Sequence, residues 1–326
     1  MMRSRLAFVL AVVALATSME FVQPVAAQSY PARPVRMVVT GAVGSGLDFL
    51  GRSIALAMEK QLGQAVIVEP DPAAGGLIAH RRVAQQAPDG YTLLFTSTVF
   101  LTHSVALKDP GYSMEKDLAP ISLVATGPFT LVTNAATPFS TFGEMVAYAK
   151  ANPGKLNYGV GGPADAFTLM MESIKRKFGI DMVGIAYKRG TADWIPGLLA
   201  NDLQLSFGAL TAALPLVQDK KLRMLAVTGS ARLPTLPDVP SFGELGMPEI
   251  RNQAFMLFAP TGTPATIVSR LNAALVAGLG ADEVKAAFAK ISFTAVGSTP
   301  EVLTTRVRDE TAFYRTVARE AGVQPQ

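Results

Sequence analysis

The chain has 326 residues, of which 49% are hydrophobic, and its 29 Lys and Arg against 25 Asp and Glu leave a formal net charge of +4. It contains no cysteine, so disulfides, iron–sulfur clusters, thiolate zinc sites and cysteine nucleophiles are excluded. The positive charges are scattered and form no basic stripe with interleaved aromatic residues, so we expect no nucleic-acid partner.

The first residues carry the pattern of a secretory signal peptide. Arg3 and Arg5 precede an apolar run over 6–17, and small residues follow it. The run is shorter than the roughly 20 apolar residues that a membrane span requires. We therefore predict a signal peptide over 1–27, cleavage after Ala27, and a periplasmic protein that is not inserted in the membrane.

Short apolar runs then alternate with longer segments of helical periodicity. Strand–helix–strand order, with strands that do not alternate in polarity, favours parallel βαβ units and an α/β fold class. In chain order, strands are predicted over 35–39, 65–68, 92–95, 121–124, 130–132, 156–159, 184–187, 203–207, 224–227 and 255–258. Helices are predicted over 49–62, 78–86, 141–151, 167–178 and 193–200, and a largely helical region begins at Thr263-Pro264.

Two extended stretches, near 121–132 and 225–258, are the best candidates for connections between domains. At roughly 100–200 residues per domain, the chain has room for two domains after the signal peptide. We expect one lobe from 28–127 together with 254–326, and a second lobe, 128–253, that is inserted in the chain.

A glycine-rich turn between the first predicted strand and helix is a candidate anion site. Its glycines let several backbone N–H groups point at one spot beside a helix N-terminus, which carries about half a positive charge. Ligands of open α/β sheets bind at such carboxyl ends of strands. Asp48 is also placed to cap the helix, and a plain tight turn is the alternative. The candidate ligand-binding residues of this turn are Gly41, Ala42, Gly44, Ser45, Gly46 and Asp48.

Two further segments follow predicted strands. The hydroxyls of Thr96, Ser97 and Thr98 could donate to a carboxylate, or serve only in a cap or turn. A second glycine-rich turn, 159–166, precedes a helix of the second lobe, and its Asp165 could cap that helix or meet a cationic group of the ligand. Two such turns on opposite lobes would suit a ligand with two acidic ends, or with one acidic and one polar end. The candidates in the second turn are Gly161, Gly162, Ala164 and Asp165.

The sequence lacks the common catalytic motifs. No Walker lysine follows a glycine-rich turn, no G-x-S-x-G occurs, and the first turn departs from the dinucleotide pattern, although Glu69 ends the next strand roughly where a ribose ligand would lie. His80 and His103 are 23 residues apart with no clustered acids, so each is expected at the surface or in packing. We expect no catalytic residue, metal or cofactor, and a secreted dehydrogenase or hydrolase is the minor alternative.

A series of short motifs, each weak alone, is specific in its order. The motifs are Tyr30-Pro31-x-Arg33-Pro34, Gly44-Ser45-Gly46-Leu47-Asp48, Ala73-Ala74-Gly75-Gly76, Ala87-Pro88-Asp89-Gly90-Tyr91-Thr92-Leu93, Ala151-Asn152-Pro153-Gly154-Lys155-Leu156-Asn157-Tyr158, Tyr187-Lys188-x-Gly190, Leu236-Pro237-Asp238-Val239-Pro240, Ala259-Pro260-x-Gly262-Thr263-Pro264 and Gly297-Ser298-Thr299-Pro300-Glu301. In this order the chain resembles the Bug or TctC-type extracytoplasmic solute receptors of tripartite tricarboxylate transporters, over essentially all of its length after the signal peptide.

The resemblance implies a two-lobed periplasmic-binding-protein fold of type II, with the ligand cleft between the lobes. It implies a small carboxylate held by backbone amides, hydroxyls and water, with Tyr187 among the ligand residues. The expected partners are the membrane subunits of a tripartite tricarboxylate-type transporter, and the receptor itself is expected to be a monomer. A sensory subunit that reports to a signalling partner is the alternative, because both roles need the same clamp.

Three places depart from the family's pattern. Pro70-Asp71 replaces Asn-Arg after the strand-ending Glu, Asp165 begins a segment that replaces Ser/Thr-x-x-His-Leu, and Gly208 replaces an acid at the end of a second-lobe strand. The loss of the acid argues against an amino-acid ligand that needs an ammonium partner, although Asp165 could compensate. We expect these departures to affect the identity of the ligand and not the fold.

Overall fold

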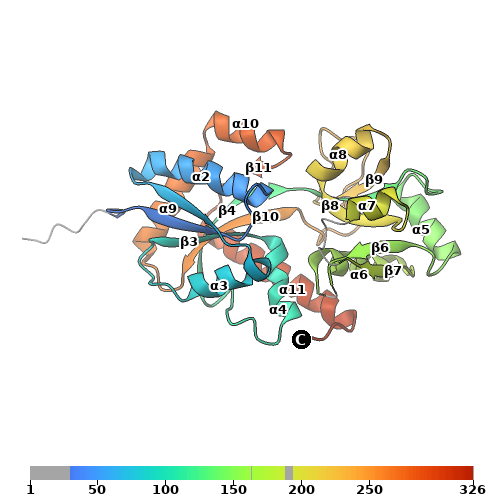
Figure 1. Cartoon of the computed structure of the whole chain (residues 1–326), viewed down its shortest axis with the longest axis horizontal. Helices are drawn as coiled ribbons and strands as arrows, with labels where there is room; N and C mark the ends of the chain where they lie inside the picture. Colours follow the sequence, from blue (N-terminus) through green and yellow to red (C-terminus); the bar gives the residue numbers. More distant parts are fainter. Residues whose placement is uncertain (1–29, 163, 188–193, 326) are drawn as a thin grey trace, which may run out of the picture. The chain divides into compact units, whose positions relative to one another are not determined.

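The computed structural model describes residues 30–162, 164–187 and 194–325, which form two β-sheets with helices packed on them (Figure 1). The predicted signal peptide over 1–27 and the Lys188–Gly190 part of one family motif lie outside the described residues.

The first sheet has six strands in the order β11-β4-β10-β3-β1-β2. β1 pairs in parallel with β2 and β3, and α2 and α3 are the helices of these βαβ units. β10 lies between β3 and β4 and runs antiparallel to both, so the parallel arrangement holds for the first three strands only. The strands are β1 (Val35–Val39), β2 (Val66–Pro70), β3 (Thr92–Ser97), β4 (Leu118–Gly127), β10 (Gln253–Pro260) and β11 (Thr294–Ala295).

The second sheet has five strands in the order β7-β6-β8-β5-β9. β6 is parallel to β7 and β8, whereas β5 is antiparallel to β8 and β9. The strands are β5 (Phe129–Asn134), β6 (Asn157–Val160), β7 (Val183–Ala186), β8 (Leu205–Ala209) and β9 (Leu222–Val227). The helices that accompany them are α5 (Phe142–Ala151), α6 (Ala166–Phe178), α7 (Trp194–Leu199) and α8 (Leu210–Gln218).

Helices cover both faces of the first sheet: α2 lies on one face, and α3 and α11 lie on the other (Figure 1). The helical region predicted from Thr263-Pro264 begins with α9, of which Pro264 is the N-cap; the sequence also suggests proline in the first helical turn, but Pro264 lies one residue before it. The sequence did not predict α8, whose interior contains Pro215, a residue that normally breaks a helix. The helical segments of the first sheet are α2 (Gly46–Leu62), η1 (Ala73–Gly76), α3 (Leu77–Ala84), η2 (Thr98–Thr102), α4 (His103–Ala106), α9 (Ala265–Leu279), α10 (Asp282–Lys290) and α11 (Pro300–Glu320).

The chain passes between the two sheets at two places, from β4 to β5 and from β9 to β10. The amide of Thr228 donates to the carbonyl of Phe129 at 2.9 Å, and the amide of Phe129 donates to the Thr228 hydroxyl at 2.9 Å. These bonds hold the two connections side by side. The lobe boundaries of 28–127 with 254–326, and of 128–253, stay a prediction.

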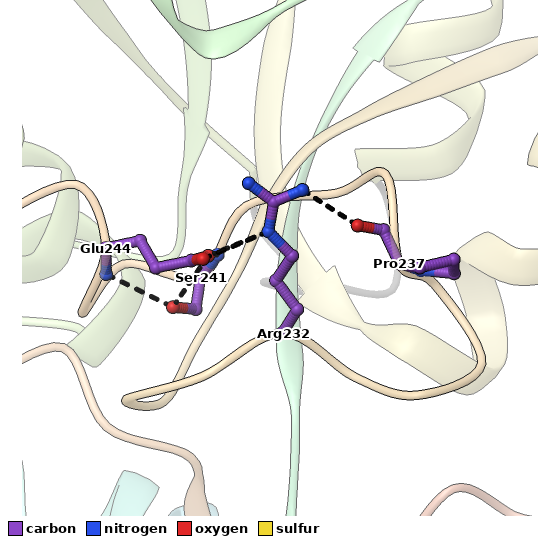
Figure 2. A network of polar contacts seen from close by, with 4 residues as sticks. All are labelled: Arg232, Pro237, Ser241 and Glu244. Atoms are coloured by element: carbon purple, nitrogen blue, oxygen red, sulfur yellow. Dashed lines mark hydrogen bonds and ion pairs between the residues drawn. The ribbon is translucent and has the colours of Figure 1, made fainter.

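A polar network holds the connection between β9 and β10 (Figure 2). Nε of Arg232 donates to both carboxylate oxygens of Glu244, at 3.0 and 3.1 Å, and its Nη1 donates to the Pro237 carbonyl at 2.8 Å. Ser241 and Glu244 also bind each other, because each side chain accepts the backbone amide of the other. The connection is therefore a folded segment and not an open tether.

One apolar cluster is continuous across both sheets. It includes Leu94 and Phe258 of the first sheet and Leu131 of the second. The next residue of β5, Val132, packs instead in a second cluster with Trp194. This alternation follows from the period-two geometry of a strand, and it places helices on both faces of β5.

His80 and His103 pack together although they are 23 residues apart in the sequence. Their ring centroids are 5.6 Å apart, and Tyr112 stacks on His80 at 4.9 Å. Nδ1 of His80 lies 2.6 Å from the carbonyl of Gly76, so this nitrogen carries the hydrogen, and Nε2 accepts from the Thr96 hydroxyl. His80 is fully buried. The packing interpretation of these residues therefore holds, and the imidazole of His80 is neutral.

Helices α2 and α9 can approach closely because Gly278 has no side chain. A Cβ there would lie 2.7 Å from Cβ of Ala57 and 3.1 Å from its carbonyl carbon. We expect Gly278→Ala to lower the free energy of unfolding by about 1–3 kcal/mol through overpacking. A Cβ on Gly143, in α5, would meet no atom within 4 Å, so Gly143→Ala should instead raise it by about 0.5–1 kcal/mol. Urea unfolding measures both changes, and equal effects would contradict the close packing.

The buried histidines should make the protein less stable in acid. Burial lowers the pKa of His80 to about 3 and that of His103 to about 4, from an ordinary 6.5. Below pH 6.5 the unfolded chain therefore binds more protons than the folded chain. The contribution of the two neutral imidazoles to the free energy of unfolding is fully present above pH 6.5. It falls as the pH decreases toward the folded pKa values, by up to about 1.4 kcal/mol per pH unit for each imidazole.

Urea midpoints between pH 7 and pH 4.5 test this, with His80→Gln as the comparison. Glu310 acts in the opposite direction, because burial raises its pKa to about 7, so the informative quantity is the difference between the two proteins. The wild type should lose more stability toward low pH than His80→Gln, and parallel curves would show that His80 does not stay neutral in the fold.

Candidate functional site

The turn after β1 owes its shape to two glycines. Gly44 has φ +82°, and a Cβ on Gly41 would lie 2.6 Å from Oγ of Ser45 and 2.9 Å from Cβ of Leu47. A larger residue would be strained at either position. Ser45 is the N-cap of α2, and its Oγ accepts the Asp48 amide at 3.2 Å. The turn thus leads directly into the start of α2, as the sequence predicts.

Asp48 is a buried acid whose bonds are made within the protein. Its Oδ2 accepts the Gly44 amide at 3.0 Å and Nε of Arg52 at 3.1 Å, and Arg52 also pairs with Oδ1 at 3.1 Å. Burial alone would raise the pKa of Asp48, but the hydrogen bonds from Arg52 and Gly44 outweigh it and lower the pKa below its ordinary value. The carboxylate is therefore charged, and Arg52 neutralises it.

Five amides of this turn remain available. Within the described chain, no acceptor binds the backbone N–H of Gly41, Ala42, Val43, Gly46 or Leu47. Ala42, Val43 and Gly46 are exposed and Gly41 is half-buried, whereas Leu47 is buried, so most of this set is open to solvent. Together with the start of α2 they form a positive surface without charged side chains, which suits a carboxylate.

The hydroxyls after β3 serve mainly the fold. Thr96 accepts from Thr40 at 3.1 Å and lies 3.1 Å from Nε2 of His80, to which it donates. Thr98 binds both the amide and the carbonyl of Ala254 in β10. The hydroxyl of Ser97 has no partner among the residues that the structure describes. Of the three predicted residues, Ser97 alone keeps a hydroxyl without a partner among the described residues, and this residue is buried, with 2% exposed.

The second turn differs from the first, because its helix is capped by a carboxylate. Oδ1 of Asp165 accepts the amides of Phe167 and Thr168 at 3.0 and 3.4 Å. The amides of Gly161, Gly162 and Ala164 have no acceptor in the described part of the chain. The start of α6 is thus already bound by an acid of the protein, while the glycines before it keep free donors.

A small pocket lies at the carboxyl end of β6, beside Ser206 near the start of β8. It brings together three predicted residues, Gly161, Asp165 and Tyr187, with five that were not predicted as ligand residues. The pocket is lined by Gly159, Val160, Gly161, Asp165, Phe167, Tyr187, Trp194 and Ser206.

The indole of Trp194 enters this region because residue 208 is a glycine. A Cβ on Gly208 would lie 2.3 Å from Cζ2 of Trp194. The absence of a side chain at Gly208 is therefore what makes room for the indole.

A second cavity, of about 300 Å³, also includes Asp165. It combines the second turn with the η2–α4 segment of the first sheet, for which the sequence carried no signal. The cavity is lined by Thr102, Ala106, Leu107, Gly161, Gly162, Ala164, Asp165, Val323 and Gln324. Predicted residues from the turn after β1 line neither this cavity nor the small pocket.

The described residues contain neither a cluster of metal-binding side chains nor a membrane-spanning helix. No group of three or more His, Asp or Glu residues there could hold a metal ion. No helix in the part of the chain that the structure covers has the length and apolar character to cross a bilayer.

Comparisons with known proteins find similar chains of nearly equal length. Protein BugT of Bordetella pertussis is 32% identical over 92% of this chain and 93% of its own. A protein of R. palustris solved with adipate is 30% identical, with a TM-score of 0.77 over 91% of this chain and all of its own. MatC from Rhodopseudomonas palustris, solved with bound malate, is 28% identical, with a TM-score of 0.73 over 89% of this chain and all of its own.

These structural neighbours confirm the predicted α/β fold of the two-lobed periplasmic-binding-protein type. Residues 50–322 match the family described as the tripartite tricarboxylate transporter family receptor, TctC. The match covers most of the chain and agrees with the resemblance of the sequence motifs. The chain therefore belongs to the TctC family of tripartite tricarboxylate transporter receptors.

Proposed function

We propose that this protein is a periplasmic receptor that binds a small organic carboxylate and delivers it to the membrane subunits of a tripartite tricarboxylate-type transporter. Membership of the TctC family supports the receptor role. The relatives solved with adipate and malate support a carboxylate as the ligand. The observation that carries the proposal is the set of five unpartnered amides at the start of α2, as far as the described chain extends.

These amides suit an anion for a simple reason. A hydrogen bond to a charged group contributes roughly 1.5–3 kcal/mol, and several converge here beside the positive end of a 17-residue helix. Asp48 does not compete for the ligand's place, because Arg52 and Gly44 already hold it. The Ser97 hydroxyl and the amides of the second turn would supply the remaining donors.

In this proposal the ligand lies in a cleft between the lobe of 28–127 with 254–326 and the lobe of 128–253. A ligand favours the closed form only to the extent that it binds that form better than the open one. Contacts from both turns at once supply this difference. The mature receptor begins after Ala27, acts as a monomer, and binds its ligand without chemical change.

A single proline tests the role of the amides. Gly46 is the first residue of α2, where proline is tolerated, and Ser45 before it has the extended φ −73°, ψ 164° that proline requires. A Cβ at Gly46 meets no atom closer than 3.6 Å. Gly46→Pro therefore removes one N–H and leaves the helix. We expect carboxylate binding to weaken roughly 10- to 100-fold, measured by calorimetry with di- and monocarboxylates.

Asp282→Pro is the matched control. Asp282 is the first residue of α10, and Ala281 before it is also extended, with φ −66° and ψ 135°. The next residue, Glu283, pairs with Lys60 near the far end of α2, so the control lies away from the turn. Equal affinities in Gly46→Pro and Asp282→Pro would refute the amide site.

A further inference from the structure

The two turns of the proposed site have opposite electrostatic character. At the first turn, the carboxylate of Asp48 is neutralised by Arg52, and five amides are open among the described residues. At the second turn, the helix start is capped by Asp165, which makes no ion pair with any described basic residue. A ligand that contacted both turns would meet N–H donors at the first and a carboxylate at the second.

The capping geometry leaves part of Asp165 free. Oδ1 is the atom that accepts the amides of Phe167 and Thr168. Oδ2 lies 3.3 Å from the Cβ position of Gly161, and both residues line the small pocket and the larger cavity. The small pocket has a volume of about 10 Å³, enough for one water molecule, and the larger cavity has about 300 Å³, so the larger cavity is the space in which a guest could reach this carboxylate.

The surroundings of this carboxylate contain no compensating charge. Among the described lining residues of both cavities, Asp165 is the charged one, and the others are apolar, aromatic or neutral polar. The Ser206 hydroxyl donates to the Phe207 carbonyl at 3.1 Å, so its donor is already used. A guest in the larger cavity therefore meets one negative charge, that of Asp165, beside the free amides of Gly161, Gly162 and Ala164.

Burial adds to this preference. It raises the pKa of the Asp165 carboxyl above its ordinary value, although the amides of Thr168, Phe167 and Ala166 oppose the rise. A partly desolvated carboxylate is stabilised by a partner that brings a proton donor or a positive charge. A second carboxylate in the same place would be repelled.

We propose that Asp165 makes the second-turn end of the site selective for a hydrogen-bond donor, so that the ligand is a monocarboxylate with a hydroxyl or ammonium group at its other end. This inference rests on the proposed function, since it assumes that both turns bind one ligand. It separates this receptor from relatives whose solved ligands, adipate and malate, carry two carboxylates. Asp165 is then the residue that determines specificity.

Matched ligands test the inference with the unaltered mature protein. The probes are adipate, 6-hydroxyhexanoate, 6-aminohexanoate and hexanoate, and the four-carbon series of succinate, 4-hydroxybutyrate, 4-aminobutyrate and butyrate. Calorimetry measures the affinities, and the fluorescence of Trp194, the single tryptophan of the chain, reports on the pocket that it lines. In at least one series, a hydroxyl or ammonium acid should bind roughly 10-fold tighter than the dicarboxylate and the unsubstituted acid.

Asp165→Asn removes the charge and keeps an oxygen that can cap α6. We expect it to lose the preference by roughly 10-fold or more, whereas Asp282→Asn, at the start of α10, should keep it. If the amino acids of the two series bind and the hydroxy acids do not, Asp165 acts as a countercharge to the ammonium group. If the amino acids and the hydroxy acids both bind, Asp165 acts as a hydrogen-bond acceptor.

Three results would overturn the inference: a dicarboxylate that binds as tightly as the donor-bearing acids, an unsubstituted acid that does so, or an unchanged preference in Asp165→Asn. In each of these cases the proposed receptor function would survive. Absence of binding by every acid would instead refute the proposed function, and the inference with it.

Discussion

In the proposed site, backbone N–H groups at the end of β1 meet the negative charge of the ligand, because the Arg52 side chain beside this turn is already paired with Asp48. This constraint determines the residues of the turn. Amides can converge only if the backbone folds tightly, and the fold requires glycine at Gly41 for space and at Gly44 for its positive φ. The parallel pairing of β1, β2 and β3 then places the turn at a sheet edge.

The elements that depend on local patterns could be predicted from the sequence. The strand at 35–39 and the helix that follows it, the turn between them, and the cap role of Asp165 all depend on residues close in sequence. The antiparallel position of β10 could not be predicted, because a buried strand has the same apolar composition in either direction. Local sequence also contains no information on the contact of His80 with His103, which joins a helix to a distant segment.

The same difference between local patterns and tertiary contacts explains why only part of the candidate site could be predicted. The turns were found because glycines and helix starts are local signals. Whether a hydroxyl is free is decided by tertiary contacts: Thr96 binds His80, and Thr98 binds Ala254 from a strand more than 150 residues later. The place of Trp194 depends on the missing side chain of Gly208, a relation between two separate elements.

The relay from Thr40 through Thr96 to His80 links the ends of β1 and β3 to the start of α3. The turn is thus anchored beneath by a buried hydrogen-bond chain, in which the Thr40 hydroxyl donates to Thr96 and the Thr96 hydroxyl donates to His80. Such a chain keeps the strand ends in a fixed relation. In the proposed site, amides that are arranged in advance in this way would lower the entropy cost of binding.

The folded connection between β9 and β10 is held at both of its ends. Val227 donates to Pro240 and accepts from Phe242, so the chain returns to β9 before it leaves the second sheet. At the other end, Arg306 of α11 donates to the carbonyl of Asn252, the residue before β10. A helix of the first sheet thus fixes the last residue of a segment whose start is fixed by the second sheet.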